Sequence, residues 1–277
     1  MQSDDDARVT DAHQPITTTF LVIRHAQSEA NSGGFFASQS DSPLSAAGIR
    51  QAEALTDACR HLTIDAVVSS DLSRARDTVA GLARARGLVV ETTPALRERA
   101  MGELTGQTFD HVQRAYPELY RALAARDPDV APPRGESHRQ LYQRVSACLD
   151  ALAARHRGAT IVISSHGGAI HHVIRHLSGL LDVAEGPWFS VDNASVTRVE
   201  QHVSSTGRRS SRLVYVNRIV GGDDRAPLLP GRPRFIVSVG PCPTWKPRSA
   251  QRSRTRSTAP TSSASARSTR GRSATTT

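Results

Sequence analysis

The sequence predicts an α/β fold, a three-layer sandwich in which a mostly parallel central sheet is flanked by helices. Short β-branched and apolar runs alternate along the chain with longer stretches whose apolar residues recur at helical spacing. This β-α-β-α order is typical of parallel strands joined by helices that pack on both faces of the sheet. Polar residues follow several of the strand-like runs directly, where open α/β sheets place their ligands.

Each element can be assigned from local patterns. Strands are expected over residues 17–23, 66–69, 88–91 and 159–164, with a closing pair over 195–201 and 213–220. Helices are expected over residues 45–61, 70–86, 109–116, 118–126 and 137–156, and from Gly167 to about residue 180. Ser45 is expected to cap the first helix and Gly87 to end the second. Residues 32–43 and 127–135 are predicted loops, and 92–107 an irregular stretch.

The charge of the chain is concentrated in one segment. The formal net charge is +9, and residues 221–277 hold eleven of the 35 basic residues against only Asp223 and Asp224. This segment, rich in Arg, Ser, Thr and Pro, has too few large apolar residues to offset the entropy of ordering. We therefore expect a flexible leader over residues 1–16, a folded domain over 17–220 and a disordered tail over 221–277. The run 235–239 is its one strand-like stretch.

The composition favours a cytoplasmic protein without membrane partners. Cys59, Cys148 and Cys242 are scattered and lack CxxC spacing, which fits free thiols in a reducing compartment. The polar, acidic N-terminal segment has no apolar core like that of a signal peptide. No apolar run approaches the ~20 residues that a membrane-spanning helix needs.

Reactive side chains follow four of the predicted strands. Arg24 and His25 end the first, Arg74 follows the second, Glu98 the third and His166 the fourth. Transfer of a phosphoryl group without a metal requires a nucleophile, fixed cations around the phosphoryl oxygens and an acid for the departing oxygen. These four segments could supply all three. A helix that begins after His166 would also point backbone N–H groups at an anion.

The same segments resemble the motifs of the histidine phosphatase superfamily, which has a phosphoglycerate mutase-like fold. Six matches occur in family order between about residues 18 and 220: Arg24-His25-Ala26 with Glu29 and Asn31; Leu44-Ser45-x-x-Gly48-x-x-Gln51-Ala52; Ser69 to Ala75; Leu96-Arg97-Glu98 with Gly102 and Gly106; Gly135-Glu136-Ser137; and Ser165-His166-Gly167-Gly168. Asp192-Asn193-x-Ser195-Val196 is similar to the final motif. The chain departs from the usual pattern at Ala26, where glycine is usual, and at Gln27, where glutamate is common.

The resemblance implies specific roles and a metal-independent phosphomonoesterase with no cofactor. By match, His25 is the phosphorylated nucleophile and Glu98 the proton donor, while His166 contacts the phosphoryl oxygens. The implied phosphate-binding residues are Arg24, Asn31, Arg74 and the Gly167 backbone N–H. The implied substrate is a small phosphorylated metabolite, and residues 32–43 and 102–135 are expected to select it.

Several alternatives stay open at this stage. Glu103 and Glu29 compete with Glu98 for the acid, and His172 with His176 has a spacing that can hold zinc, although we expect no metal. A cofactor-dependent phosphoglycerate mutase is the nearest rival activity. The 68 positions from Glu98 to His166 leave little room for the cationic insertion of such enzymes. Arg134 alone is a poor replacement for the cationic residues of that insertion. A non-catalytic phospho-ligand or nucleic-acid binding protein is the rival of another class, although only the tail is basic. A homodimer is also compatible with the sequence.

Overall fold

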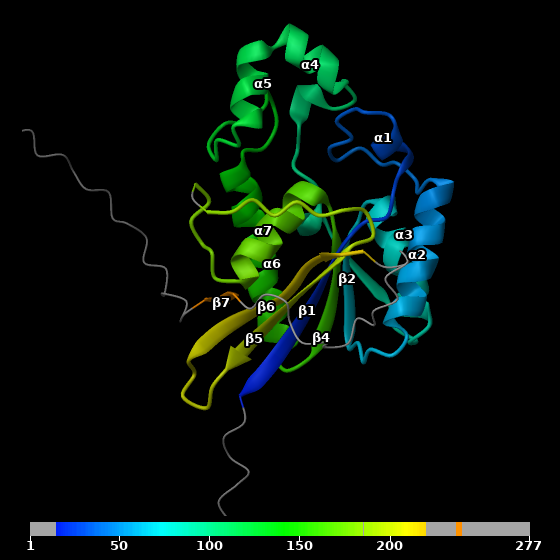
Figure 1. The fold of residues 1–277 in the computed structure, drawn as a ribbon, viewed down its shortest axis with the longest axis vertical. Coiled ribbons are helices and arrows are strands. Elements are labelled where there is room, and N and C mark those ends of the chain that lie inside the picture. The colour runs from blue at the N-terminus through cyan, green and yellow to red at the C-terminus, as the bar shows by residue number, and fades with distance from the viewer. Residues whose placement is uncertain (1–14, 185, 220–236, 240–277) are drawn as a thin grey trace, which may run out of the picture. The chain divides into compact units, whose positions relative to one another are not determined.

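The computed structural model of the chain describes residues 15–184, 186–219 and 237–239 (Figure 1). Its seven strands form one sheet in the order β3-β2-β4-β1-β5-β6-β7. Neighbouring strands among β3, β2, β4 and β1 pair in parallel, and β5, β6 and β7 continue the sheet antiparallel. The strands are β1 (Ile16–Arg24), β2 (Ala66–Ser70), β3 (Val90–Thr93), β4 (Thr160–Ser165), β5 (Val196–Val203), β6 (Arg209–Arg218) and β7 (Val237–Val239).

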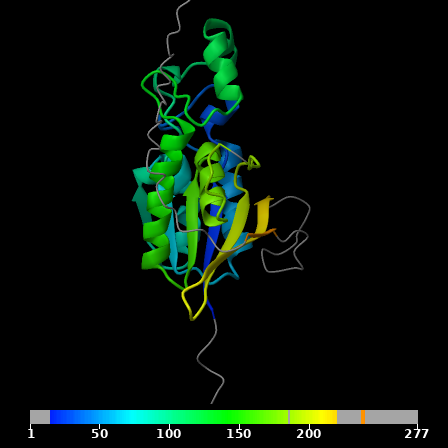
Figure 2. The ribbon, with the colours of Figure 1, turned by 90° about the vertical axis from the view of Figure 1, so that its left-hand side faces the viewer.

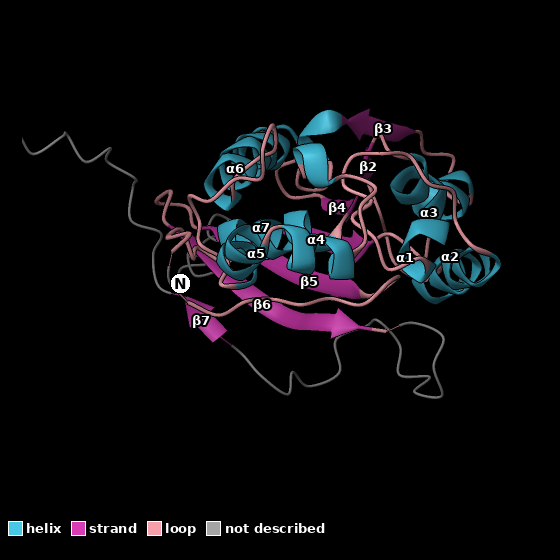
Figure 3. Cartoon of the chain, turned by 90° about the horizontal axis from the view of Figure 1, so that it is seen from above, coloured by secondary structure: helices cyan, strands magenta, loops and turns pink. Residues whose placement is uncertain are grey.

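Helices cover both faces of this sheet, which confirms the predicted α/β sandwich (Figure 3). Residues of β1 alternate between two hydrophobic clusters. Phe20 and Val22 pack with α6 and α7, whereas Leu21 and Ile23 pack with α2 and α3. The helices are α1 (Glu29–Ser32), α2 (Ala46–Cys59), α3 (Ser73–Arg84), α4 (Phe109–Ala115), α5 (Pro117–Ala124), α6 (His138–Arg155) and α7 (Gly167–Leu177).

Local capping explains where the long helices begin. The Ser45 hydroxyl accepts the Gly48 N–H at the start of α2, as predicted. Ser137 and Gln140 form a reciprocal capping box at the start of α6. The short helix α1 was not expected from the sequence. It is closed by a second capping box between Ser28 and Asn31.

The two short helices α4 and α5 lie beyond the carboxyl ends of the parallel strands, at the top of Figures 1 and 2. Met101, Leu104 and Val112 form a small separate core there, against which the partly buried Phe36, Leu119, Tyr120 and Leu123 pack. Residues 33–37 pair with 106–108 through isolated backbone contacts. The two segments expected to select the substrate therefore contact each other. We call α4, α5 and these segments the cap.

The prediction for the third strand was displaced by two residues. The apolar run at residues 88–90 was assigned to a strand over 88–91, but β3 covers Val90–Thr93. Gly87 has φ +64°, and the N–H groups of Gly87 and Leu88 return to the carbonyls of Arg84 and Ala83. This is a Schellman motif, in which the apolar residue after the glycine packs back on the helix and does not begin a strand.

Two further boundaries differ from expectation. Helix α7 ends at Leu177, before residue 180, and β3 is followed by a 3-10 turn at Pro94–Leu96 within the stretch expected to be irregular. Strand β7 lies beyond the expected domain boundary at residue 220, within the strand-like run 235–239, and it pairs with β6. The remainder of the predicted tail, and residues 1–14 of the predicted leader, lie outside the described residues. No helix among the residues that the structure describes is long and apolar enough to cross a membrane.

Candidate active site

The ends of β1, β4 and β2 bring the two motif histidines together. Strands β1 and β4 are adjacent, and the His25 N–H donates to the Ser165 carbonyl at 2.9 Å. The ring centroids of His25 and His166 lie 5.0 Å apart. Ser70, the last residue of β2, contacts His166, because its hydroxyl lies 2.9 Å from His166 Nε2. The structure therefore brings His25, His166 and Ser70 together at adjacent strand ends.

His25 is held in one tautomer. Its side chain is buried, and Nδ1 lies 2.7 Å from the Ala26 carbonyl oxygen. A carbonyl can only accept, so Nδ1 carries the proton and Nε2 presents a lone pair. Burial, with a further contribution from Arg74, lowers the pKa of His25 to about 3. The imidazole is therefore neutral and nucleophilic at physiological pH.

His166 is fully buried beside it. Burial lowers the pKa of His166 well below its ordinary value. Repulsion from His25 if both rings were protonated, and the positive charges of Arg74, Arg24 and Arg144, act in the same direction. Its Nε2 faces Ser70, whereas Nδ1 is buried and has no hydrogen-bond partner among the described residues. An oxyanion next to His166 would satisfy this nitrogen and offset the surrounding positive charge.

Two arginines are fixed near the histidines by backbone carbonyls. Arg24 Nη1 donates to the Val191 carbonyl at 2.6 Å, and Arg24 Nε is buried without a partner among the described residues. Arg74, only 2% exposed, donates through Nη1 to the Ser40 carbonyl and through Nη2 to the Ser38 carbonyl. Burial lowers the pKa of both guanidinium groups. Arg24 thus keeps a buried N–H available, while Arg74 also anchors the 32–43 loop to the site.

The carboxylate of Glu98 lies at the start of α7. It accepts hydrogen bonds from the N–H groups of Gly168 at 3.1 Å and Ala169 at 3.2 Å, and from Arg99 N–H at 2.8 Å. Its rivals lie elsewhere: Glu103 pairs with Arg134 at 3.2 Å, and Glu29 is exposed. A Cβ atom at Gly168 would come within 2.6 Å of Glu98 Oε1, so a glycine is needed for this contact.

Asn31 and Gly167 complete the set of predicted residues. Asn31 Oδ1 accepts from Ser28 N–H and from Asn193 Nδ2, and Asn193 Nδ2 also donates to the His25 carbonyl. Asn193 therefore ties Asn31 to the segment that carries His25. Gly167 is the first residue of α7, and a Cβ atom there would lie 3.7 Å from the Arg24 guanidinium and 4.0 Å from Glu98. The structure brings Gly167 next to both.

The two departures from the usual motif are accommodated locally. Ala26 is fully buried, its φ is not in the left-handed region, and its N–H donates to Thr78 Oγ1 at 2.8 Å. Gln27 contacts the start of α2, where its amide oxygen accepts from the Ser45 hydroxyl and its N–H donates to Gln51. The methyl group of Ala26 therefore requires no strained backbone.

Sequence reasoning missed several supporting residues. Ser70 and Thr78 each contact the site through one hydrogen bond. Arg144 donates hydrogen bonds to main-chain carbonyls of the segment that carries Glu98. Ser70 lies within the matched Ser69 to Ala75 segment, and its placement at a strand end was a usable signal. Nothing in the spacing of Thr78 or Arg144 distinguishes them from other helical residues.

The histidines of α7 do not form a zinc site with their neighbours. His172 Nε2 lies 3.1 Å from His138 Nδ1, and His176 contacts Asp150 and Tyr142. Within the described parts of the chain, no group of three or more His, Cys, Asp or Glu residues is arranged to hold a metal ion.

Comparison with known proteins gives one family. A "Probable phosphoglycerate mutase GpmB" of Yersinia pestis is 32% identical over 183 residues, which are 66% of this chain and 85% of that protein. The structure of a mycobacterial glucosyl-3-phosphoglycerate phosphatase is 31% identical, with a TM-score of 0.61 over 67% of this chain and 91% of its own. The alpha-ribazole phosphatase of Shigella flexneri is 26% identical, with a TM-score of 0.64 over 74% and 98%. The family model of the histidine phosphatase superfamily (branch 1) matches residues 20–210, and the chain belongs to that superfamily.

Proposed function

We propose that this protein is a phosphatase that hydrolyses a phosphate monoester through a phosphohistidine at His25. The observation that carries the proposal is the state of His25: a buried, neutral imidazole with Nδ1 held by the Ala26 carbonyl and Nε2 free to attack. Two arginines and a second histidine surround it, as a phosphoryl group with three charged oxygens requires. The structural similarity to a glucosyl-3-phosphoglycerate phosphatase and an alpha-ribazole phosphatase adds support.

In the first step, His25 Nε2 attacks phosphorus in line with the ester oxygen. The N–P bond forms as the P–O bond breaks, and Glu98 transfers a proton to the departing alkoxide. The imidazole acquires positive charge in this step. The Ala26 carbonyl 2.7 Å from Nδ1 stabilises that charge and prevents rotation of the ring.

In the second step, water attacks the phosphohistidine. Glu98 accepts a proton from the water, the N–P bond breaks, and inorganic phosphate and neutral His25 are released. The same carboxyl group therefore serves as acid and then as base. Its fixed position at the start of α7, through Gly168 and Ala169, suits both duties.

The cations hold the transferring group throughout. Arg24 contributes its buried Nε, His166 its buried Nδ1, and Gly167 its backbone N–H at the start of α7. Arg74 supplies positive charge and fixes the adjacent loop, and Asn31 borders the same site through Asn193. These groups stabilise charge on the phosphoryl oxygens and need no metal ion for that purpose.

We further propose that the substrate is a small phosphorylated metabolite of the cytoplasm. The cap segments contact one another and the site, since the Gln39 amide donates to the Glu98 carbonyl and Ser38 Oγ accepts the Met101 N–H. Differences in these segments would select the alcohol part of the ester. A panel of phosphorylated metabolites, scored by phosphate release, identifies that part.

A mutase is the second candidate, because the similar Yersinia pestis protein carries that name. A mutase must hold a second anionic group, and Arg134 is a poor candidate because its side chain is 85% exposed and paired with Glu103. Incubation with 3-phosphoglycerate and 2,3-bisphosphoglycerate distinguishes the two reactions. A phosphatase gives free phosphate, and a mutase gives isomerised phosphoglycerate.

The direct test is p-nitrophenyl phosphate hydrolysis in EDTA by wild type, His25→Ala and the control His61→Ala, at an exposed histidine. We expect activity with wild type and the control, and a loss of at least ~1,000-fold in His25→Ala. Rapid acid-free quenching with a radiolabelled substrate should show an alkali-stable phosphoenzyme that His25→Ala lacks. Activity that survives His25→Ala, or that disappears with EDTA, overturns the mechanism.

A further inference from the structure

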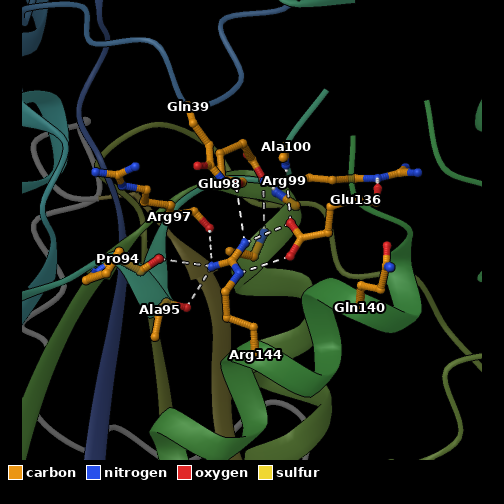
Figure 4. Close-up of polar contacts among 12 residues, drawn as sticks. Gln39, Pro94, Ala95, Arg97, Glu98, Arg99, Ala100, Glu136, Gln140 and Arg144 are labelled. Carbon is orange, nitrogen blue, oxygen red and sulfur yellow. Dashed lines mark hydrogen bonds and ion pairs between the residues drawn. The ribbon is translucent and has the colours of Figure 1, made fainter. Parts of the chain in front are cut away.

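The segment that carries Glu98 has little regular structure of its own. Apart from the 3-10 turn at Pro94–Leu96, residues 94–101 form neither helix nor strand. Four of their carbonyls instead converge on one guanidinium, that of Arg144 on α6 (Figure 4). Arg144 Nη1 lies 2.8 Å from the Ala95 oxygen and 3.2 Å from those of Pro94 and Arg97, and Nη2 lies 3.4 Å from that of Glu98.

Glu136 fixes the orientation of this guanidinium. Its carboxylate binds Arg144 in bidentate fashion, with Nε at 3.0 Å and Nη2 at 2.8 Å. The same residue is tied to the end of the segment, because its N–H donates to the Ala100 carbonyl at 2.8 Å and its Oε2 accepts the Ala100 N–H at 3.2 Å. The side chains of Arg144 and Glu136 are 24% and 13% exposed. Such a planar fork has one geometry, which a lysine cannot reproduce.

The pair acts on Glu98 through its main-chain carbonyl and not through its carboxylate. The Glu98 carbonyl accepts from Arg144 and from Gln39 Nε2 at 3.1 Å, while the carboxylate binds the N–H groups at the start of α7. A free backbone over residues 97–99 would let the carboxyl group move away from the ester oxygen. Because proton transfer depends steeply on position, a shift of about 1 Å can cost ~100-fold in rate.

We propose that Arg144 and Glu136 are positioning residues for the proton donor Glu98. This inference rests on the proposed phosphatase function. It predicts an effect that a merely structural ion pair would not have. Loss of the pair should slow transfer of the phosphoryl group to His25 when the leaving group needs a proton from Glu98, and should spare that transfer when the leaving group needs none.

Leaving groups separate these two possibilities. Nitrophenolate departs without a proton, whereas an alkoxide requires one, and a general acid is worth about 10²–10⁴-fold for such a group. The assay compares kcat/KM for p-nitrophenyl phosphate with kcat/KM for the best alkyl phosphate of the metabolite panel. This quantity reports only the steps up to release of the alcohol and excludes the later hydrolysis of the phosphohistidine, in which Glu98 acts as base. The variants are Arg144→Gln, Arg144→Lys and Glu136→Gln, with Glu98→Gln as the reference for loss of the acid.

Arg155→Gln is the matched control, since Arg155 also lies on α6 and its exposed ion pair is with Glu91 and not with residues 94–101. We expect Arg144→Gln and Arg144→Lys to lose roughly 100-fold with the alkyl phosphate and little with the nitrophenyl ester. Glu136→Gln should show the same pattern to a smaller extent, and Arg155→Gln no change. Glu136→Gln keeps the shape of the side chain and serves if the Arg144 variants do not fold.

The outcomes distinguish the two proposals. An equal loss with both substrates, or no loss with either, in variants that remain folded overturns the positioning role. A Glu98→Gln variant without leaving-group dependence, or an inactive wild type, overturns the proposed function and not the role of the pair alone.

Discussion

Three buried histidines predict how the stability of this protein depends on pH. His138 on α6 and His171 and His172 on α7 lie against one another and against Trp188, and we call these four residues the histidine cluster. The His171 ring stacks on Trp188 with centroids 3.6 Å apart, and the Arg126 guanidinium lies 4.2 Å from the Trp188 ring centroid. Tyr142, on α6, packs edge-on against His172.

Burial is the main cause of their altered titration. It lowers the pKa of His138 and His171 to about 3 and that of His172 to about 2. Neighbouring positive charges act in the same direction, namely those of Arg99, Arg126, Arg175 and the other histidines of the cluster.

The sign follows from proton binding. The folded-state pKa of each histidine is below the unfolded value of about 6.5, so below pH 6.5 the unfolded chain binds more protons and acid favours unfolding. Between about pH 5.5 and 4, each histidine lowers the free energy of unfolding by about 1.4 kcal/mol per pH unit. The three together lower it by about 4 kcal/mol per pH unit. By pH 5 the three together remove about 6 kcal/mol, so a domain at the low end of ordinary stability, about 5 kcal/mol, should unfold near that pH.

Urea unfolding followed by far-UV circular dichroism at half-unit steps from pH 7.5 to 4.5 measures this slope. Replacing His172 removes one proton from the difference, so His172→Gln should flatten the slope by about 1.4 kcal/mol per pH unit, whatever its stability at neutral pH. His171→Phe, which keeps an aromatic ring beside Trp188, should do the same. His61→Gln, at an exposed position, is the control. A slope in His172→Gln and His171→Phe equal to that of wild type would refute the reasoning.

Two glycines give further predictions. Gly168→Ala would place a Cβ 2.6 Å from Glu98 Oε1, so we expect a loss with alkyl phosphates of about 10-fold or more and little loss with p-nitrophenyl phosphate, measured as kcat/KM for both substrates. Gly48→Ala would place a Cβ 2.0 Å from the Gln27 carbonyl oxygen, a backbone atom, and should lower the free energy of unfolding by about 3 kcal/mol in urea titrations. Gly81→Ala, which meets only the Thr56 side chain at 3.0 Å, should change stability by less than about 1 kcal/mol. Equal effects of the last two would contradict the steric argument.

Much of the fold could be predicted because local patterns and tertiary packing agree. In β1, the apolar residues on both faces indicate a strand buried on both sides, and Phe20 and Leu21 indeed pack into different clusters. The helix start at Ser137 has its own capping signal, and the structure contains it. The predicted strand over residues 88–91 was displaced because the apolar Leu88 fits two patterns, the start of a strand or the end of a Schellman motif. Only the φ of Gly87 decides between them.

Site residues whose chemistry follows from their own residue type could be predicted from the sequence. Properties that depend on a neighbour in space could not. His25, Glu98 and His166 follow strands, and parallel strand ends lie at one edge of the sheet. The neutral state of His25 could not be predicted, because it depends on burial and on a carbonyl 2.7 Å away. Arg144 is 46 positions from Glu98 in the sequence, and only the packing of α6 against residues 94–98 brings them together.

The partners of the arginines explain why some can serve phosphate and others cannot. Arg97 and Arg144 bind the carboxylates of Asp71 and Glu136 in bidentate fashion, which commits their N–H groups to fixing the chain. Arg24 and Arg74 are instead oriented by backbone carbonyls, which fix a guanidinium without cancelling its charge.

Orientation by carbonyls leaves Arg24 and Arg74 without an ion pair among the described residues, which is unfavourable for the folded protein and favourable for the proposed reaction. The uncancelled charges of Arg24 and Arg74 add to the burial that lowers the pKa of His25 and His166, so both imidazoles are neutral. A neutral His25 is the form that can attack phosphorus, and a positive surrounding is the one that an oxyanion prefers. A carboxylate partner in place of the Ser38 and Ser40 carbonyls would bind Arg74 more strongly. It would also weaken the positive potential at His25. The carbonyl contacts of Arg74 therefore account for both the loop position and the charge of the site.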